Sequence, residues 1–232
     1  MNSLSVIIPA YNEEKDILNS LNQNISILDQ TGIDYEIIII NDGSTDDTKK
    51  LIETNFTFSS RLKLHSKKNG GFGSAIRLGI ELSIKDYIVF IPVDSPLDQN
   101  QITEINKNIG KAYVLVSYRT NRLGYTNRMK INSKIFHILI SILFNLRLKD
   151  YTWIHVYNRS IFSEHNISIE FDGIFMLPEI IIKAKNKNLT IAEFPLMMYE
   201  RKNGSATSAS YKVAIRTFYD TLKFFIKIKL KK

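Results

Sequence analysis

The chain has 232 residues, of which 44% are hydrophobic, so it can bury a substantial core and does not have the composition of a disordered protein. It contains no cysteine, which excludes disulfides and thiolate metal sites, and its four histidines lie too far apart in sequence for a local metal motif. The formal net charge of +8 favours an anionic partner, which could be nucleic acid, an acidic membrane surface or a phosphorylated substrate.

The first residues, MNSLSVIIPAYNEE, lack the basic start and the small-residue cleavage site of a secretory signal. No run of about 18 uninterrupted apolar residues occurs, so we expect no transmembrane helix. We therefore expect a cytoplasmic protein, or one bound peripherally to the cytosolic face of a membrane.

Two early apolar runs predict strands that are buried on both faces of a parallel sheet. LSVIIPA (residues 4–10) and YEIIIINDGS (residues 35–44) are rich in β-branched residues and end at turn residues. Apolar residues recur at helical spacing over residues 13–30, which completes a βαβ unit. The next predicted elements are a helix at residues 45–54, a strand at 62–66, a helix at 73–83 and a strand at 87–94. This alternation predicts an α/β doubly wound fold, with a mostly parallel central sheet and flanking helices.

The second half of the chain is less regular. Its predicted elements are a helix that contains Ile102 and Ile105, a strand at residues 112–118, a helix at 131–146, an unassigned segment at 153–162, a helix at 176–187 and a strand at 189–199. Apolar residues surround nearly the whole helix 131–146, which is either a core helix or a membrane-contacting one. We find no repeat and no low-complexity linker, and expect a single domain over residues 1–210 with a basic amphipathic tail over residues 211–232.

Polar clusters directly follow three of the predicted strands. These are PAYNEE at residues 9–14, NDGSTDDT at residues 41–48, and the strand tip at Asp94. Open parallel sheets bind ligands beyond the carboxyl ends of their strands, so the three clusters are candidates for one site. They also have an ordinary structural explanation, because Asn12, and Ser44 or Thr45, could cap the helices that follow.

A fourth cluster, HSKKNGGFGSAIRLGI at residues 65–80, is rich in glycine directly before a predicted helix. A helix N-terminus is positive, and glycine lets a phosphate approach it closely. The complete dinucleotide-binding fingerprint is absent, because Ile76 stands where the third glycine would be. This cluster alone is a weak indication of phosphate binding.

In this order, SVIIPAYNEE, IIIINDGSTDDT, NGGFGSAIRLG and an Asp-bearing strand end resemble the family 2 glycosyltransferases with the GT-A fold, most closely the dolichyl-phosphate mannosyltransferase-like branch. The resemblance continues through VSYR (residues 116–119), Asp150 and IAEFPLMMYERKNGSATS (residues 191–208). It implies a GT-A domain over residues 1–210, with a nucleotide-binding half over residues 1–100 and an acceptor half over residues 101–210.

The resemblance also implies a site for a nucleotide-sugar donor. By position, the donor-binding residues would be Pro9, Tyr11 and Glu13 around the base and ribose, Asn41 and Asp42 beside the base, Asn69 and Gly73 in the glycine-rich segment, and Asp94. Asn41 stands where an Asp is common in the family, so the identity of the base stays open.

Asp94 stands where the family carries an Asp-x-Asp motif that holds a divalent ion against the donor diphosphate. This chain has PVDSP at residues 92–96, so a single carboxylate remains. Mg²⁺ commonly binds through one or two carboxylates together with substrate phosphates and water. We therefore expect a weakly bound divalent cation, Mg²⁺ or Mn²⁺, with Asp94 as its ligand. Asp98 is better explained as the N-cap of the helix that contains Ile102.

Basic residues are expected to bind the phosphates of both substrates. Arg201 matches the family arginine that contacts the donor phosphate, and Lys202 and Lys212 are further candidates. Arg119 and Arg128 lie where relatives receive the phosphate of a lipid acceptor, although a solvated basic loop is the ordinary alternative.

The implied reaction moves a sugar, with inversion, from a nucleotide sugar to a polyprenyl phosphate or to a lipid-linked or cell-surface glycan precursor. The metal and Arg201 would stabilise the leaving diphosphate. A lipid phosphate is already ionised and needs no base, whereas a hydroxyl acceptor would need one, with Asp150 and Glu179 as candidates. The implied catalytic set is Asp94, Arg201 and Asp150.

Three other classes of protein share parts of this pattern. A sugar nucleotidyltransferase would carry a GxGxR loop where this chain has PAYNEE. A nucleotide-sugar-binding protein without turnover would explain the reduced metal motif. A nucleic-acid binder should cluster its basic residues with exposed aromatic ones, whereas they are scattered here, so we expect no nucleic acid but an anionic membrane surface as partner. The oligomeric state stays open.

Overall fold

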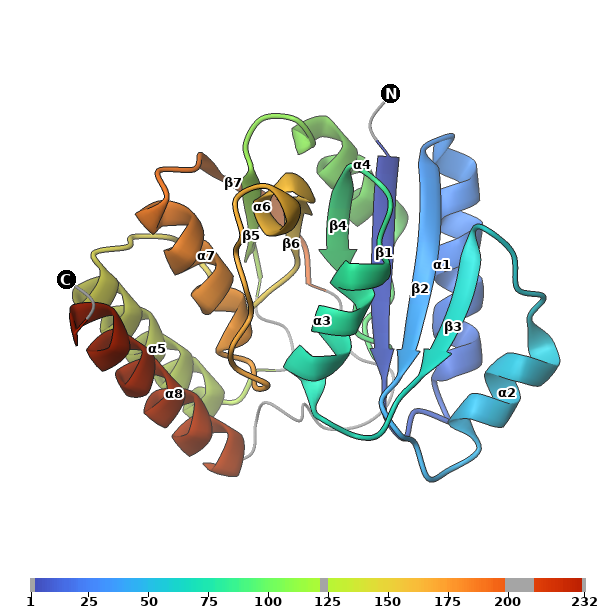
Figure 1. The fold of residues 1–232 in the computed structure, drawn as a ribbon, viewed down its shortest axis with the longest axis horizontal. Coiled ribbons are helices and arrows are strands. Elements are labelled where there is room, and N and C mark those ends of the chain that lie inside the picture. The colour runs from blue at the N-terminus through green and yellow to red at the C-terminus, as the bar shows by residue number, and fades with distance from the viewer. Residues whose placement is uncertain (1–2, 122–124, 199–210, 231–232) are drawn as a thin grey trace.

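The computed structural model describes residues 3–121, 125–198 and 211–230, and these ranges contain seven strands and eight helices (Figure 1). The strands are β1 (Ser3–Ala10), β2 (Asp34–Asn41), β3 (Leu62–Ser66), β4 (Tyr87–Phe90), β5 (Val114–Arg119), β6 (His155–Asn158) and β7 (Ile191–Leu196). The helices are α1 (Ile17–Thr31), α2 (Thr48–Asn55), α3 (Phe72–Leu82), α4 (Gln99–Asn108), α5 (Asn127–Phe144), α6 (Ser160–Ser163), α7 (Met176–Asn186) and α8 (Tyr211–Leu230).

All seven strands form one sheet in the order β3-β2-β1-β4-β6-β5-β7. Neighbouring strands are parallel except β6, which runs antiparallel to both β4 and β5. The predicted doubly wound, mostly parallel sheet is therefore confirmed. The antiparallel β6, which lies within the segment left unassigned from the sequence, joins the strands of the first half to those of the second.

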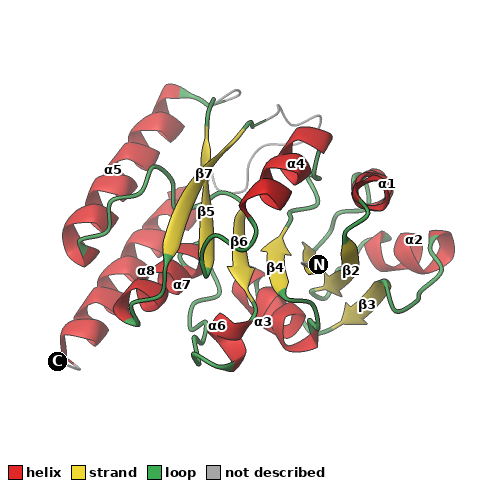
Figure 2. Cartoon of the chain, turned by 90° about the horizontal axis from the view of Figure 1, so that it is seen from above, coloured by secondary structure: helices red, strands yellow, loops and turns green. Residues whose placement is uncertain are grey.

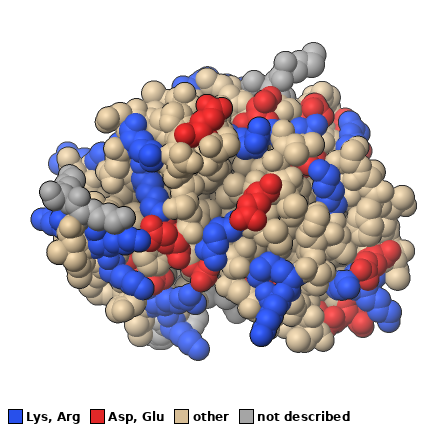
Figure 3. All heavy atoms as spheres, in the orientation of Figure 1, with Lys and Arg blue, Asp and Glu red and all other residues tan. Residues whose placement is uncertain are grey.

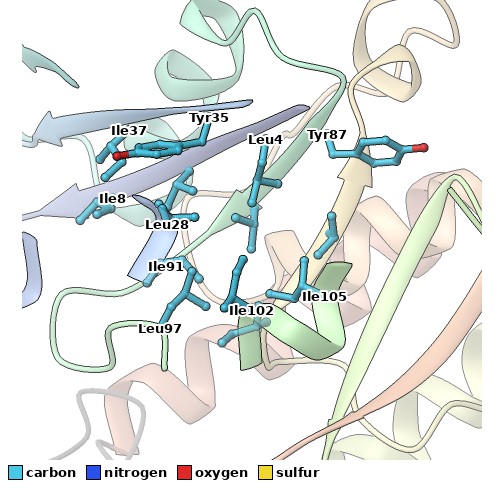
Figure 4. Close-up of a cluster of buried hydrophobic side chains, with 14 of the residues drawn as sticks. Leu4, Ile8, Leu28, Tyr35, Ile37, Tyr87, Ile91, Leu97, Ile102 and Ile105 are labelled. Atoms are coloured by element: carbon cyan, nitrogen blue, oxygen red, sulfur yellow. The ribbon is translucent and has the colours of Figure 1, made fainter. Parts of the chain in front are cut away.

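Both faces of the sheet are buried. Successive side chains of a strand point to opposite faces, and those on each face belong to a core cluster of their own. In β1, Val6 and Ile8 belong to a core cluster with residues of α1 and α4, whereas Ile7 belongs to a second cluster with α3 and α7. Figure 4 shows part of the first cluster, in which Leu28 of α1 and Ile102 of α4 meet the sheet. Viewed from above, α1, α2 and α4 lie on one side of the sheet and α3, α6 and α7 on the other (Figure 2).

The main differences from the predicted boundaries occur at strand ends and helix starts. The strand predicted over residues 87–94 ends at Phe90, because Pro92 has no backbone N–H for the ladder. The helix predicted from residue 13 begins at Ile17, because residues 11–16 form a loop that bonds to its neighbour. The apolar helix begins earlier than predicted, at Asn127, where the Thr126 hydroxyl accepts a bond from the Met129 N–H.

Helices α5 and α8 lie side by side at the β7 end of the molecule (Figures 1 and 2). Phe144 of α5 contacts Phe224 of α8, with ring centroids 5.9 Å apart, and Phe224 is buried in the second core cluster. Helix α5 is not the core helix that one alternative foresaw, because Ile140 is its one fully buried residue. Within the described part of the chain, no helix has the length and apolar character needed to cross a membrane.

Lys and Arg side chains are distributed over the face seen in Figure 1 and are interspersed with Asp and Glu (Figure 3). No single basic patch dominates that face, which agrees with the scattered basic residues of the sequence. A groove for nucleic acid would need them to gather together with exposed aromatic rings.

Candidate active site

The predicted polar clusters meet at one edge of the sheet. Ala10 at the end of β1 pairs with Asn41 at the end of β2, and Asn41 pairs with Ser66 at the end of β3, so three strands end level. Beyond β4 the chain continues toward the same edge, since the Ile91 N–H donates to the Ile7 carbonyl at 3.0 Å. The loops after all four strands therefore converge, as expected for parallel strands.

The loops after β1 and β2 are bonded directly to each other. The Asn12 carboxamide oxygen accepts from the Thr45 N–H at 2.8 Å, and the Ser44 hydroxyl accepts from the Asn12 N–H at 3.1 Å. The Glu13 N–H donates to the Thr48 hydroxyl at 2.7 Å. The capping roles suggested for Asn12, Ser44 and Thr45 are therefore wrong, and Asp46 serves α2 instead, because its carboxylate accepts from the Thr48 N–H at 3.0 Å.

Asp42 holds the glycine-rich segment against the end of β2. Its buried carboxylate accepts from the N–H groups of Gly70 at 3.0 Å and Gly71 at 2.8 Å, and from the Lys67 ammonium at 2.5 Å. A carboxylate that accepts several charged or backbone donors is strongly fixed in place. The glycine-rich segment and the NDGSTDDT loop are thus one unit.

The other predicted donor-binding residues surround this unit. Asn41 accepts from the Ser44 N–H at 3.0 Å and donates to the Ser66 hydroxyl at 3.2 Å, which fixes its amide. Tyr11 is 47% exposed beside the site, and Asn69 is also exposed. Pro9 and Glu13 are partly buried. The Tyr11 ring and the Asn69 amide are therefore exposed to solvent, whereas the Asn41 amide is already engaged within the chain.

Gly73 has a structural task that the sequence did not reveal. It is buried at the start of α3, and a Cβ added there would lie 2.2 Å from the Phe171 carbonyl oxygen. Its N–H donates to the Asp172 carbonyl at 2.9 Å. Glycine at this position therefore lets α3 approach residues 171–172, in addition to any part it plays toward a phosphate.

Asp94 is partly buried in the loop that links β4 to α4. The loop is fastened to α1 by two side chains that sequence reasoning missed. The Asn24 amide oxygen accepts from the Leu97 N–H at 3.0 Å, and the Gln23 amide donates to the Leu97 carbonyl at 2.8 Å. The sequence carried one indication of this role, because Asn24 is a polar residue in the apolar stripe of α1. In the structure it is fully buried.

The prediction that Asp98 caps the following helix is confirmed. Its carboxylate accepts from the N–H groups of Asn100 at 2.7 Å and Gln101 at 3.0 Å, and the Gln101 side chain completes a capping box. Asp98 therefore serves as a helix cap, and Asp94 is the residue of this loop at the position where the sequence predicts a metal ligand.

A divalent cation fits this edge with few ligands from the chain. No three Asp, Glu or His side chains of the described residues are grouped closely enough to form a metal cage. One carboxylate together with diphosphate oxygens and water is a normal set for Mg²⁺. The oxygen chemistry of Asp94 suits such an ion, which would then depend on the bound diphosphate for most of its ligands.

Arg119 and Asp150, predicted for different roles, form a buried ion pair with each other at 2.6 Å. The Arg119 guanidinium also donates to the Thr152 carbonyl at 3.0 Å and stacks on the Trp153 ring, 4.4 Å from its centroid. Burial alone would raise the pKa of Asp150, but the Arg119 charge and the Thr152 N–H outweigh it and hold the pKa below its usual value. Asp150 is therefore ionised and engaged at neutral pH.

A neutral histidine lies next to this ion pair. His155 on β6 is buried, and burial lowers the pKa of its imidazole to about 4. Its Nδ1 lies 3.1 Å from the Tyr157 hydroxyl. The ring is uncharged at neutral pH, because the desolvated cation would lie beside Arg119.

The remaining predicted residues are not gathered at this edge. Arg128 lies exposed in the first turn of α5, and Lys212 is exposed on α8. Glu179 on α7 is buried and accepts from the Lys183 ammonium at 2.7 Å and the Glu170 N–H at 2.9 Å. Arg201 and Lys202 lie outside the described residues.

Residues 5–165 match the family model described as glycosyl transferase family 2. A dolichyl-phosphate beta-glucosyltransferase of Trichomonas vaginalis is 27% identical over 215 residues, covering 82% of this chain and 62% of that protein. An undecaprenyl-phosphate 4-deoxy-4-formamido-L-arabinose transferase of Proteus mirabilis is 26% identical over 153 residues, covering 65% of this chain and 47% of that protein. The chain thus spans less than two thirds of the length of both relatives.

The fold also matches a solved structure. Glucosyl-3-phosphoglycerate synthase from Mycobacterium tuberculosis, in complex with Mn²⁺, uridine diphosphate and phosphoglyceric acid, superposes with a TM-score of 0.70 at 19% identity. The match covers 95% of this chain and 78% of that one. At this identity the similarity shows the fold, which is the GT-A fold expected from the sequence.

Proposed function

The chain belongs to glycosyl transferase family 2, and on that basis we propose that it transfers a sugar, with inversion, from a nucleotide-sugar donor to an acceptor. One observation carries the proposal: the loops after β1, β2, β3 and β4 converge at a single edge, where Asp42 fixes the glycine-rich segment. Such an edge is where open α/β sheets bind nucleotides.

The donor would lie across the loops after β1 and β2. Tyr11 offers an exposed ring to the base, and Pro9 and Glu13 lie beside it on the same loop. The exposed Asn69 and the start of α3 would face the diphosphate. The N–H groups of Gly70, Gly71 and Gly73 already donate within the chain, so the helix dipole rather than these N–H groups would favour the negative charge. Asn41 and Asp42 would act mainly by fixing these loops, since their side chains bond within the chain.

A divalent cation at Asp94 would neutralise the negative charge that develops on the leaving diphosphate. The chain's own contribution is to hold Asp94 in a loop that Asn24 and the Asp98 cap keep in place. Arg201 is proposed as the second diphosphate-binding group, on the sequence resemblance alone. Arg201→Lys would keep the charge and lose the fork, so we expect a clear loss of rate.

We propose a polyprenyl phosphate as acceptor, or else a lipid-linked glycan precursor. Two relatives, a dolichyl-phosphate and an undecaprenyl-phosphate transferase, support this class. They do not favour the mannosyltransferase-like branch over others, so the sugar stays open. Arg119 and Arg128 are proposed to face the acceptor phosphate, and Asp150 to orient Arg119 through their ion pair. A hollow of about 300 Å³ between α5 and Tyr151 has a mixed lining, with the apolar Ile138, Ile142 and Leu148 beside His137, Ser141 and Arg147, and its apolar part suits a lipid chain.

Two exposed apolar stripes support a peripheral site on the cytosolic face of a membrane. On α5 the stripe consists of Ile131, Ile135, Ile138 and Ile142, and on α8 it consists of Ile215, Phe218, Tyr219, Ile226 and Leu230, all 48% or more exposed. On α5 the spacings are three and four residues, and on α8 Ile215, Tyr219, Ile226 and Leu230 are four or seven residues apart with Phe218 beside them, so each stripe lies on one helix face. Exposed basic residues flank them, including Lys134 on α5 and Lys223 on α8. This composition suits an anionic lipid surface.

The alternative is a nucleotide-sugar-binding protein without turnover. It would keep the donor edge described above and would lack only the second carboxylate of the metal motif. Turnover separates the two functions, because both predict nucleotide binding and only one predicts product.

The test of function uses a panel of nucleotide sugars with Mn²⁺ or with EDTA, and measures sugar transfer to a short polyprenyl phosphate. We expect transfer with one donor, loss with EDTA, and a rate at least about 10²-fold lower in Asp94→Asn, in keeping with loss of a key electrostatic group. Asp34→Asn is the matched control, because that carboxylate lies at the opposite end of the sheet and pairs with Lys85. An Asp94→Asn enzyme with full activity and unchanged metal dependence would remove Asp94 from the mechanism.

The membrane is tested by co-sedimentation with vesicles of phosphatidylcholine, with and without phosphatidylserine. We expect salt-sensitive binding to the anionic vesicles, which weakens in Ile135→Ser/Ile142→Ser. Ile84→Ser is the control, because Ile84 is 63% exposed but lies outside both stripes. Point changes are preferable to deletion of residues 218–232, which would remove the buried Phe224 from the core. Equal binding of the stripe variant and the original chain would count against the membrane site and favour an acceptor in solution.

A further inference from the structure

Residues 168–173, which we call the brace loop, contact the start of α3. The Asp172 carbonyl accepts from the Gly73 N–H at 2.9 Å, and a Cβ on Gly73 would lie 2.2 Å from the Phe171 carbonyl oxygen. Backbone thus packs directly on backbone at the first turn of the helix that follows the glycine-rich segment. A shift of the brace loop would have to move α3 or leave the Gly73 N–H without its acceptor.

An ion pair fastens the same two segments one turn further along α3. The Arg77 guanidinium lies 2.5 Å from the Asp172 carboxylate, and it also reaches the Ile169 carbonyl at 3.5 Å. The two side chains of the pair are 34% and 36% exposed, so the pair alone contributes little to stability. The pair instead fixes the position of the brace loop along α3, since Asp172 contacts α3 through both its backbone and its side chain.

The glycine-rich segment is therefore held from two sides. Asp42 at the end of β2 accepts from the N–H groups of Gly70 and Gly71, and Asp172 of the brace loop accepts from that of Gly73. Asp42 belongs to a predicted donor loop, whereas Asp172 lies far along the chain, outside every motif that the sequence offered.

The brace loop is itself fastened to α7. The Glu179 carboxylate accepts from the N–H groups of Glu170 at 2.9 Å and Phe171 at 3.2 Å. The Lys183 ammonium joins Glu179 at 2.7 Å to Glu170 at 3.0 Å and to the Ser168 carbonyl at 2.8 Å. The buried Glu179 is thereby explained as a support of the loop.

Helix α8 closes the other side of the brace loop. Phe224 of α8 is buried against the ring of Phe171, with centroids 5.8 Å apart, and Lys227 forms an ion pair with Glu170. Gly173 lies against Asp220 of α8, since a Cβ there would be 3.6 Å from the Asp220 carboxylate. Contacts therefore run without interruption from α8 through the brace loop to the glycine-rich segment.

We propose that the brace loop couples the position of α8 to the position of the glycine-rich segment, with Asp172 and Glu170 as its positioning residues. The proposal rests on the proposed function for the ligand, which is the diphosphate of a nucleotide-sugar donor. As a consequence, an anionic membrane surface that holds α8 in place would also hold the glycine-rich segment in place. Donor affinity then rises when α8 is docked on that surface.

The test compares Asp172→Ala and Glu170→Gln with Glu53→Gln, which changes an exposed ion pair of α2 and serves as the control. Hydrogen exchange is measured at the amides of residues 70–75. We expect exchange to be about two- to fivefold faster in both brace variants, the range set by a partly exposed ion pair, and unchanged in the control. Affinity for UDP or GDP and the KM for the donor should change by a similar factor, while the KM for the acceptor stays constant.

Two further measurements keep a structural effect apart from transmission. The reversed pair Arg77→Asp/Asp172→Arg should restore slow exchange if the ion pair sets the position of α3. Anionic vesicles should slow exchange at residues 70–75 in the original chain and much less in Glu170→Gln. Unchanged exchange in both brace variants would overturn the proposal. If no nucleotide sugar or nucleoside diphosphate of the donor panel binds the original chain, the proposed function fails, while the exchange measurements still decide whether the brace loop couples α8 to the glycine-rich segment.

Discussion

At the scale of single residues, Asp42 shows how one buried acid can organise the edge where four strand ends converge. It is 4% exposed and accepts from two glycine N–H groups and from Lys67. Because the carboxylate is charged and its donors are fixed, these bonds are worth more than neutral ones.

We expect Asp42→Asn to lower the free energy of unfolding by about 2 to 4 kcal/mol, since an amide cannot accept from all three donors and leaves Lys67 without its counter-charge. Urea unfolding measures this loss. Asp47→Asn is the control, because the Asp47 side chain is 66% exposed in its ion pair with Lys50. Equal effects in the two variants would show that Asp42 has no special role.

His155 gives a prediction about pH. Its pKa is about 4 in the folded protein against an ordinary 6.5, because the buried ring resists protonation. Between these two values the unfolded chain binds a proton that the folded chain does not, so the free energy of unfolding falls as the pH drops from 6.5 to 4. The contribution amounts to about 3 kcal/mol at full extent.

The measurement is urea unfolding of the original chain and of His155→Gln at several pH values. Only the difference between the two curves is read, because Glu179 and Asp220, whose pKa values burial raises, act in the opposite direction in both proteins. The free energy of unfolding of the original chain minus that of His155→Gln should decrease steadily as the pH falls from 6.5 to 4. A constant difference would mean that His155 titrates normally.

At this scale the sequence predicted some roles and missed others for clear reasons. The Asp98 cap was predicted because Asp98 precedes the helix that contains Ile102 and Ile105, and a cap is a local motif; the structure adds that Gln101 completes a capping box. Asn12 looked equally local, yet its partner is Thr45 on another loop. Arg119 and Asp150 neutralise each other across 31 residues, a pairing that no local pattern announces.

At the scale of elements, α4 links stability to the loop that carries Asp94. Its first turn is held by the Asp98 capping box, directly after the point where Asn24 holds Leu97. Loss of the cap should fray this turn and release the end of the loop.

We expect Asp98→Ala to lower the free energy of unfolding by about 1 kcal/mol, the usual cost of losing an N-cap. Thermal unfolding is the measurement, and Gln99→Ala, an exposed position in the same turn, is the control. A loss no larger than that of Gln99→Ala would show that the box does not hold the helix.

Helices and strands were predictable where a single hydrophobic pattern dominated the sequence. The strands β1 and β2 are buried on both faces and read as continuous apolar runs, so they were found. The strand β6 has four residues and two antiparallel neighbours, and nothing in its sequence marks that direction. Helix α5 has apolar residues on both its inner and outer sides, so periodicity alone could not separate a core helix from one with an exposed stripe.

At the scale of the whole molecule, β6 makes the two predicted halves mutually dependent. It lies between β4 of the first half and β5 of the second, and the core cluster on the α1 side includes both Leu4 and Trp153. We expect one cooperative unfolding transition for the whole chain.

Trp153 is the single tryptophan of the chain and lies where the two halves meet, so its fluorescence reports on that junction. Its urea transition should coincide with that of far-ultraviolet circular dichroism, and addition of UDP or GDP with Mn²⁺ should shift both together. Transitions with separate midpoints would show that the halves unfold independently.

The convergence of strand ends could be inferred from the sequence, because parallel strands in a doubly wound sheet place their ends at one edge. The brace loop could not be inferred. Arg77 and Asp172 are 95 residues apart, and the need for glycine at position 73 comes from a backbone that approaches from another part of the chain. Such contacts depend on tertiary packing and leave no periodic trace.

The placement of β6 also affects how the protein emerges during translation. Strand β4 pairs with β1 on one side, but its other neighbour is completed only after residues 91–154 have been synthesised. At about 5–20 residues per second, that apolar edge stays open for several seconds. An open edge can pair with other nascent chains. Pausing of the ribosome within residues 91–154 is therefore expected to lower the yield of correctly folded protein.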